Sequence, residues 1–346
     1  MKTRKFDGLA GTDWLIREVS VSDKGLAKRF AERFGVSRAA ASNFIKTNVG
    51  NGFLIRTGSS TRPKYALGVN RMLTKSYRIN EQLDESLIWA NDFLPFLGEL
   101  KSNVSQICDY GFTEMVNNAK DHSEGDELFV LVFKEEEEIT IFVKDDGVGV
   151  YQKISDKFNL GDLRLAHFEL CKGKLTTDKK NHTGEGIFFT SRSFDIYWLM
   201  ANGLYFDHQD ESELDWLHGF DRTKNEGTTV LMMIHTDSDR DLTEVFNKFT
   251  SDDGDFAFDK TVIPVNLVRM GEENLVSRSQ AKRLLNRIDA FKFVGLDFKD
   301  VNFIGQAFAD EIFRVFQNNH PEITFRVMNA NDGVKAMINR AKNRTN

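Results

Sequence analysis

Apolar residues recur at helical spacing in the first part of the chain. Between residues 24 and 34 they fall on one face of a predicted helix, and residues 22–23 can cap its start. Gly35 supplies a turn, because glycine adopts the left-handed conformation that ends many helices. Ser37 then caps a second predicted helix at 38–47.

Strand patterns follow these two helices. The segments 53–56 and 64–67 are rich in apolar and aromatic residues, and they flank a flexible tip at 58–63 that contains glycine, serine and proline. This pattern predicts a β-hairpin. We therefore expect residues 1–80 to form a small module of helices and one hairpin.

The central part of the chain, 81–250, mixes helix and strand patterns and predicts an α/β domain. Helical spacing over 81–100 leads into the helix that carries Glu114. Apolar runs predict strands at 127–133, 139–143, 195–201 and 203–206.

A third module, 256–346, follows an acidic linker at 251–255 that contains glycine. Strand patterns at 261–267, 293–298 and 324–328 alternate with helical patterns at 280–288, 305–318 and 332–342. This order predicts a small α/β domain. The whole chain is therefore expected to be an α/β protein of several domains.

Three short motifs in the central part carry the candidate chemistry. Glu114 and Asn118 are four residues apart and share one helix face. A carboxylate beside an amide can position a water and Mg²⁺, which prefers oxygen ligands. The Asp145-Asp-Gly-Val-Gly149 segment ends a predicted buried strand, and Gly184-Glu-Gly precedes an apolar run. The latter can expose backbone N–H groups at the start of a helix, where phosphates bind.

In this order and spacing, the motifs resemble the N, G1 and G2 boxes of the GHKL ATPases, the family of gyrase and the histidine kinases. Gly227-Thr-Thr229 resembles the start of the last strand of that fold. The resemblance covers 85–235 and implies the α/β sandwich called the Bergerat fold, with ATP and Mg²⁺ as cofactors. It makes the stretch 150–183, which holds six lysines, the ATP lid. A lid is expected to be mobile until ATP orders it.

The resemblance also implies a role for individual residues. Glu114 would be the general base, Asn118 the Mg²⁺ ligand, and Asp145 the acceptor for the adenine amino group. The remaining ATP-binding residues would be Gly147, Gly149, Gly184, Gly186 and Thr228. The alternative for Glu114 is a purely structural residue at the edge of the cleft.

The residue type at position 114 differs between members of this family that have different activities. Histidine kinases commonly carry asparagine there and need a phosphoacceptor hairpin, which is not evident in this chain. The Glu-x-x-x-Asn-Ala-x-x-His pattern that starts at Glu114 resembles the anti-sigma-factor kinases and the hydrolysing members. We expect a slow ATPase switch that couples its Mg-ATP state to DNA or partner binding. A serine/threonine kinase acting on a separate STAS-like protein and an ATP-binding regulator without turnover remain alternatives.

Charge is distributed unevenly along the chain. Residues 1–80 hold 16 Lys and Arg against 5 Asp and Glu, whereas the remainder holds 30 against 47. A basic module on an acidic body favours nucleic-acid binding, although the two parts could simply attract each other. The first module resembles a winged helix-turn-helix, and the alternative for it is dimerisation. The residues implied for DNA are Arg38, Ser42 and Asn43 at the major groove and Lys46, Arg56, Arg62 and Lys64 at phosphates.

The third module resembles the STAS domains of anti-sigma-factor antagonists, and more closely the STAS-like domain fused behind such ATPases. The resemblance rests on the segment 296–305 and implies a protein partner. In phosphorylated STAS proteins, the turn after this strand presents a serine or threonine. Here the turn has the residues Gly305-Gln-Ala307, so we do not expect it to accept phosphate.

Composition excludes some protein classes. No run of 18 apolar residues occurs, and the first seven residues lack the apolar core of a signal peptide. We therefore expect a cytoplasmic protein that does not enter a membrane. The seven histidines are scattered and indicate no metal other than the Mg²⁺ of the nucleotide.

Overall fold

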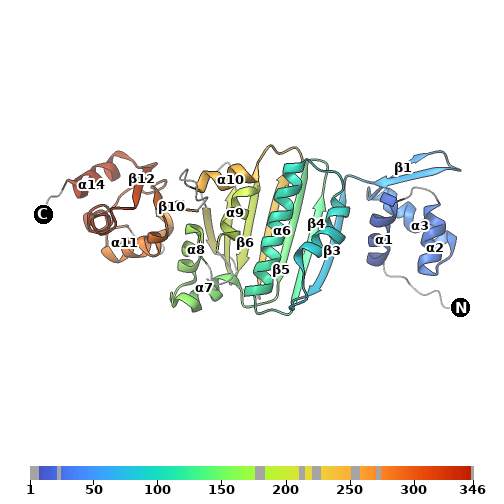
Figure 1. Cartoon of the computed structure of the whole chain (residues 1–346), viewed down its shortest axis with the longest axis horizontal. Coiled ribbons are helices and arrows are strands. Elements are labelled where there is room, and N and C mark those ends of the chain that lie inside the picture. Colours follow the sequence, from blue (N-terminus) through green and yellow to red (C-terminus); the bar gives the residue numbers. More distant parts are fainter. Residues whose placement is uncertain are drawn as a thin grey trace.

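The computed structural model describes residues 8–21, 25–175, 184–209, 215–219, 227–250, 258–269 and 274–343. Three sheets of two, seven and three strands follow one another along the molecule (Figure 1). The first and last helices in the described residues, Gly8–Val21 and Asp332–Lys342, lie toward opposite ends of this row (Figure 1).

The described residues of the first part of the chain form three helices and a hairpin. The helices are α1 (Gly8–Val21), α2 (Leu26–Phe34) and α3 (Arg38–Gly50), and the hairpin pairs β1 (Leu54–Gly58) with β2 (Pro63–Leu67). The cap predicted for Ser37 is present, since its hydroxyl accepts a bond from the Ala40 amide. The predicted cap at 22–23 lies outside the described residues.

The central sheet has the strand order β3-β4-β5-β9-β6-β7-β8, with every neighbouring pair antiparallel. Its strands are β3 (Arg71–Arg78), β4 (Glu127–Lys134), β5 (Glu138–Asp145), β6 (Ile196–Ala201), β7 (Leu204–Gln209), β8 (Asp215–Gly219) and β9 (Thr228–His235). β3 was not predicted. It follows the hairpin and pairs with β4 along its whole length, so the predicted first module, 1–80, contributes a strand to the central sheet.

Helices pack on one face of this sheet, with the long helix α6 (Ser102–His122) across its middle (Figure 1). Side chains alternate between buried and more exposed along β4 and β5, as expected for a sheet with one covered face. The helices α4 (Glu85–Ile88), α5 (Leu94–Leu97), α9 (Gly186–Ser193) and α10 (Leu242–Phe249) complete this layer, and a π-helical turn, Trp89–Phe93, joins the first two. No helix in the described ranges is long and apolar enough to cross a membrane.

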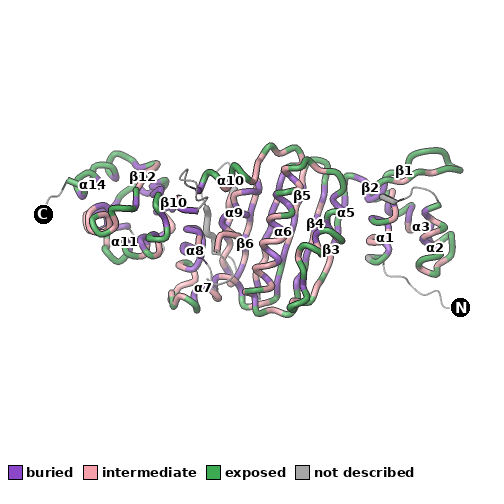
Figure 2. Tube along the Cα trace, viewed as in Figure 1, coloured by how far each residue is buried: buried purple, intermediate pink, exposed green. Residues whose placement is uncertain are grey.

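The stretch 150–183, which the family resemblance makes the ATP lid, is mostly helical in its described part. Residues 150–172 form α7 (Val150–Phe158) and α8 (Leu163–Lys172), and the last seven residues of α8 are buried (Figure 2). Residues 176–183 lie outside the described residues. α8 is therefore a packed helix, and two of its charged side chains are in the interior.

The C-terminal part is the predicted alternation of strands and helices. Strands β10 (Lys260–Pro264), β11 (Phe293–Asp297) and β12 (Thr324–Met328) form a parallel sheet in that order. The helices are α11 (Arg278–Leu285), α12 (Gln306–Asp310), α13 (Gln317–Asn319) and α14 (Asp332–Lys342), with a π-helical segment, Glu311–Phe316, between α12 and α13. Phe168, Phe188 and Phe189 of the central part belong to the same apolar core as this sheet.

Candidate functional site

A cavity of about 280 Å³ lies between α6, α7, the ends of β5 and β9, and the residues around α9. Of the residues predicted to bind the nucleotide, all except Gly147 line it: Glu114, Asn118, Asp145, Gly149, Gly184, Gly186 and Thr228. The structure thus brings together side chains and glycines from four segments that are far apart in sequence. His122, one turn beyond Asn118 on α6, also lines the cavity.

The side-chain NH₂ group of Asn118 makes no hydrogen bond among the described residues. Its Nδ2 atom is closed off from solvent and has no hydrogen-bond partner. A buried donor without an acceptor is costly, by about 1–3 kcal/mol, and is uncommon in folded proteins. In the wall of a cavity, such a group indicates a place where an acceptor from a ligand would bind.

Asp145 closes another part of the cavity and is only 6% exposed. Its Oδ1 accepts hydrogen bonds from the backbone N–H groups of Gly147 (2.9 Å) and Thr228 (3.1 Å). Burial raises the pKa of Asp145 above its ordinary value, and the two backbone donors oppose this rise. The donors also fix the orientation of the carboxylate. Gly147 does not line the cavity, but its amide helps to orient the Asp145 carboxylate, which does.

Gly186 begins α9 in direct contact with Glu114. A methyl group added at Gly186 would overlap Oε2 of Glu114, so only glycine permits this approach. The contact places the carboxylate of Glu114 beside the first turn of α9. The N-terminal end of a helix attracts negative charge, and the start of α9 lies beside Glu114 in the cavity wall.

Several residues of the cavity wall were not predicted. Lys153 projects from α7 and forms an ion pair with Glu124. Leu170, Leu175 and Phe188 form an apolar part of the wall. Lys153 could have been found, because it lies four residues beyond Gly149 at the start of a helix, whereas the apolar residues carry no distinctive motif.

The predicted DNA-binding residues lie on α3 and on the hairpin. Arg38, Ser42, Asn43, Lys46, Arg56, Arg62 and Lys64 are all exposed. Most of β1 is exposed, as the colour of the tube at this end of the molecule shows (Figure 2). The four residues on α3 and the three on the hairpin thus lie at the surface of the molecule.

In the C-terminal part, Gly305 caps α12 and Gln306 and Ala307 begin it. No hydroxyl group is present at these three positions. A family model described as a STAS-like domain of unknown function matches residues 280–335. The chain carries a STAS-like domain. This domain includes α11, β11, β12 and the helices between the two strands. A comparison of the chain with curated proteins finds no match.

Proposed function

We propose that the central part of the chain is a GHKL-type ATP-binding unit, and that the protein is a slow ATPase switch. The observation that carries the proposal is the convergence in one cavity of Glu114, Asn118 and Asp145 with the glycines on both sides of α7 and α8. Each of these residues is of the type that the family resemblance requires at its position.

Asp145 is the acceptor for adenine in this proposal. Its carboxylate is buried and held by the amides of Gly147 and Thr228, so it meets a ligand in a fixed orientation. A carboxylate accepts a hydrogen bond from the exocyclic amine of adenine. Guanine presents a carbonyl at the same place, and two acceptors facing each other repel. The cavity should therefore distinguish ATP from GTP.

The phosphates bind beside the start of α9. Asn118 would hold Mg²⁺ through its Oδ1, and its unpaired Nδ2 offers a donor to a phosphate oxygen. Mg²⁺ would neutralise charge on the phosphates. Glu114 removes a proton from the attacking water as the water oxygen bonds to the γ-phosphorus. The bond from that phosphorus to the β-γ bridging oxygen breaks, and ADP leaves.

The output of the switch is DNA binding through the basic N-terminal part. Its support is the excess of Lys and Arg in residues 1–80 and the exposure of all seven candidate residues. A protein partner bound by the STAS-like domain is a second output. Dimerisation through the N-terminal part is the alternative use of that surface.

Calorimetry of the full chain with Mg-ATP and Mg-GTP tests the proposal. We expect ATP to bind at least about tenfold more tightly, which corresponds to about 1.4 kcal/mol. Equal affinities, or no binding of ATP, would contradict it. Release of free phosphate then separates hydrolysis from passive binding. Transfer of the labelled γ-phosphate to a separate STAS-like protein would instead favour the kinase alternative.

A further inference from the structure

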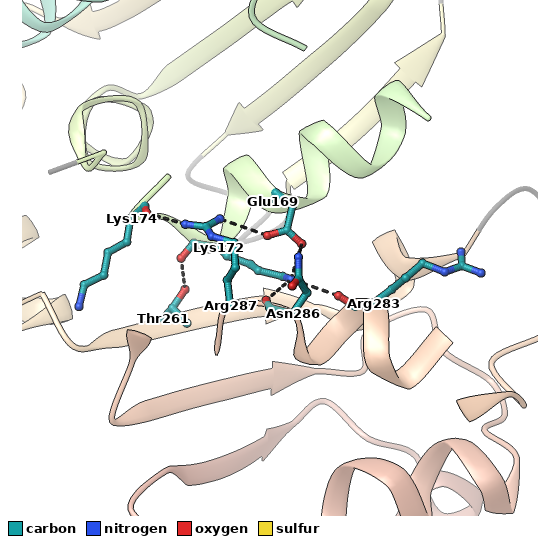
Figure 3. Close-up of polar contacts among 7 residues, drawn as sticks. All are labelled: Glu169, Lys172, Lys174, Thr261, Arg283, Asn286 and Arg287. Carbon is teal, nitrogen blue, oxygen red and sulfur yellow. Dashed lines mark hydrogen bonds and ion pairs between the residues drawn. The ribbon is translucent and has the colours of Figure 1, made fainter. Parts of the chain in front are cut away.

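Part of the cavity wall is attached to the STAS-like domain by a buried charged cluster (Figure 3). Glu169 and Lys172 lie one turn apart on α8, are 3% and 1% exposed, and form a 2.8 Å ion pair. Lys172 Nζ also donates to the carbonyl oxygens of Arg283 (3.2 Å) and Asn286 (2.8 Å). Arg287 Nη1 donates to Glu169 Oε2 at 3.1 Å. We call these five residues the α8 anchor.

Two charged side chains of the α8 anchor, Glu169 and Lys172, are buried. Burial lowers the pKa of Lys172 to about 8, and the neighbouring Glu169 opposes this decrease. Glu169 receives bonds from Lys172, from Arg287 and from Asn286 Nδ2 at 3.1 Å. Removing one partner from a buried ion pair leaves an uncompensated charge and is strongly destabilising. The α8 helix is therefore favoured in one position on the STAS-like domain.

The residues after α8 continue the attachment toward the cavity. Thr261 donates to the carbonyl of Lys172 at 2.8 Å, and Arg287 Nη2 donates to the carbonyl of Lys174. Lys174 Nζ donates to the Ala290 carbonyl at 2.8 Å. The next residue is Leu175, which lines the cavity and donates from its amide to the carbonyl of Gly184. Continuous hydrogen bonds thus lead from the STAS-like domain to a glycine of the proposed phosphate site.

Aromatic packing attaches the α9 side of the wall as well. Phe188 lines the cavity, and its ring centroid lies 4.7 Å from that of Phe258, which precedes β10. Phe258 also contacts Phe291 at 5.4 Å. Gly173 has a φ of +82°, and a methyl group there would come within 2.7 Å of the Phe258 ring. The backbone after α8 therefore lies directly against the same aromatic ring as the α9 side chain.

From these contacts we infer that the STAS-like domain sets the affinity of the cavity for its nucleotide, by holding α8, its following residues and α9 in the binding position. This inference rests on the proposed nucleotide function. A wall that is already ordered loses less conformational entropy on binding. The coupling is reciprocal by thermodynamic necessity, so the nucleotide must in turn stabilise the attachment of α8 to α11.

The test compares two arginines of the STAS-like part in the full chain. Arg287 and Arg314 each have a side chain that is 23% exposed and bond to a buried carboxylate, Glu169 and Asp310 respectively. Glu169, the partner of Arg287, lies on α8, whereas Asp310, the carboxylate that Arg314 contacts, lies on α12. We expect Arg287→Gln to weaken Mg-ATP binding at least about fivefold, the lower end of measured couplings, and Arg314→Gln to leave it within about twofold of the parent.

A milder variant and a second measurement keep the test decisive. Asn286 is exposed, so Asn286→Ala removes one bond to Glu169 with little effect on the fold, and it replaces Arg287→Gln if circular dichroism shows that variant unfolded. Hydrogen exchange in the parent should show α11 amides more protected with Mg-ATP, and Arg287→Gln should reduce this gain.

The outcomes separate the inference from the proposed function. If the parent binds ATP but α11 exchange is unchanged and the Arg287 and Arg314 variants bind alike, the inference is wrong and the ATP site stands. Tighter binding by Arg287→Gln would also overturn it, since the attachment would then oppose binding. A parent that binds no nucleotide would overturn both.

Discussion

The backbone amide of Thr228 donates a 3.1 Å hydrogen bond to Oδ1 of Asp145, across 83 residues of sequence. The same oxygen accepts the amide of Gly147 at 2.9 Å. Two segments of the chain therefore orient one carboxylate. These two hydrogen bonds hold the Asp145 carboxylate in one orientation when a ligand contacts it.

Asp145→Asn should lower ATP affinity at least about tenfold while the protein stays folded. An amide is a weaker acceptor than a carboxylate, and its NH₂ group would face donors. Loss of a charge-assisted hydrogen bond costs about 1.5–3 kcal/mol. Calorimetry measures the effect, with Asp146→Asn as the control, because Asp146 is exposed and accepts bonds outside the cavity. Unchanged affinity in Asp145→Asn would remove this residue from the site.

Glu114→Gln should bind Mg-ATP about as the parent does and release phosphate at least roughly a hundredfold more slowly. A general base acts on the attacking water and not on the bound nucleotide, and glutamine preserves the packing against Gly186. Single-turnover phosphate release and calorimetry measure the two effects. Hydrolysis at the parental rate would show that Glu114 is structural.

Asn118→Ala should behave differently and lose both affinity and rate. The alanine removes the proposed Mg²⁺ ligand together with the buried Nδ2 donor. The same two measurements apply, with Mg²⁺ titrated at fixed ATP. An Asn118→Ala variant whose Mg²⁺ dependence matches that of the parent would place the metal elsewhere.

DNA binding by the full chain should weaken steeply with salt. If about six phosphates are contacted, log K should fall with log salt at a slope near −5. Arg38→Ala should weaken binding to a preferred sequence more than to random DNA, whereas Lys64→Ala should weaken both alike. Fluorescence anisotropy measures these affinities. Absence of duplex binding at low salt, together with a dimer in light scattering, would favour the dimerisation alternative.

The buried Lys172 gives stability a specific pH dependence. Its pKa in the folded protein is lowered to about 8 from an ordinary 10.5, mainly by burial. Between these values the unfolded chain holds the proton and the folded chain releases it, so rising pH favours the folded state. Urea unfolding at pH 8 and pH 10 should show the parent gaining stability relative to Lys172→Met, by at most about 1.4 kcal/mol per pH unit. An unchanged difference would show that Lys172 titrates normally.

Most of the residues predicted to bind the nucleotide lie in one cavity, but two strands of the central sheet, β3 and β8, were not predicted. The motif residues could be found because glycines, carboxylates and amides at fixed spacing are unusual outside ligand sites. β3 was missed because its inward positions are mostly polar: Arg71, Leu73, Lys75 and Tyr77. Arg71 is buried and donates to the Leu97 carbonyl, while Lys75 and Tyr77 contact Asp92. A strand that buries polar groups on distant partners lacks the apolar alternation by which strands are recognised.

The same limit explains why the packed position of α8 was not predicted. Glu169 and Lys172 indicate an exposed helix or loop when the sequence is considered alone, because charged residues are seldom fully buried unless they are paired. The two side chains pair with each other, but the partners that join them to the STAS-like domain lie more than 110 residues later, at Arg283, Asn286 and Arg287. No local pattern reveals such a pairing, so the attachment to the STAS-like domain becomes visible only in three dimensions.

The position of β3 has a practical consequence for cutting this protein into pieces. The Gly68 amide bonds to the Phe53 carbonyl at the base of the hairpin, so only Val69 and Asn70 separate the hairpin from β3. If the chain is cut after β3, β3 stays with the hairpin and is lost from the central sheet. In the remaining fragment, β4 becomes the edge strand and exposes a row of unpaired backbone groups. Such an edge is a template for aggregation. A fragment of the central part should therefore begin before Arg71, and a fragment of the basic module should end there.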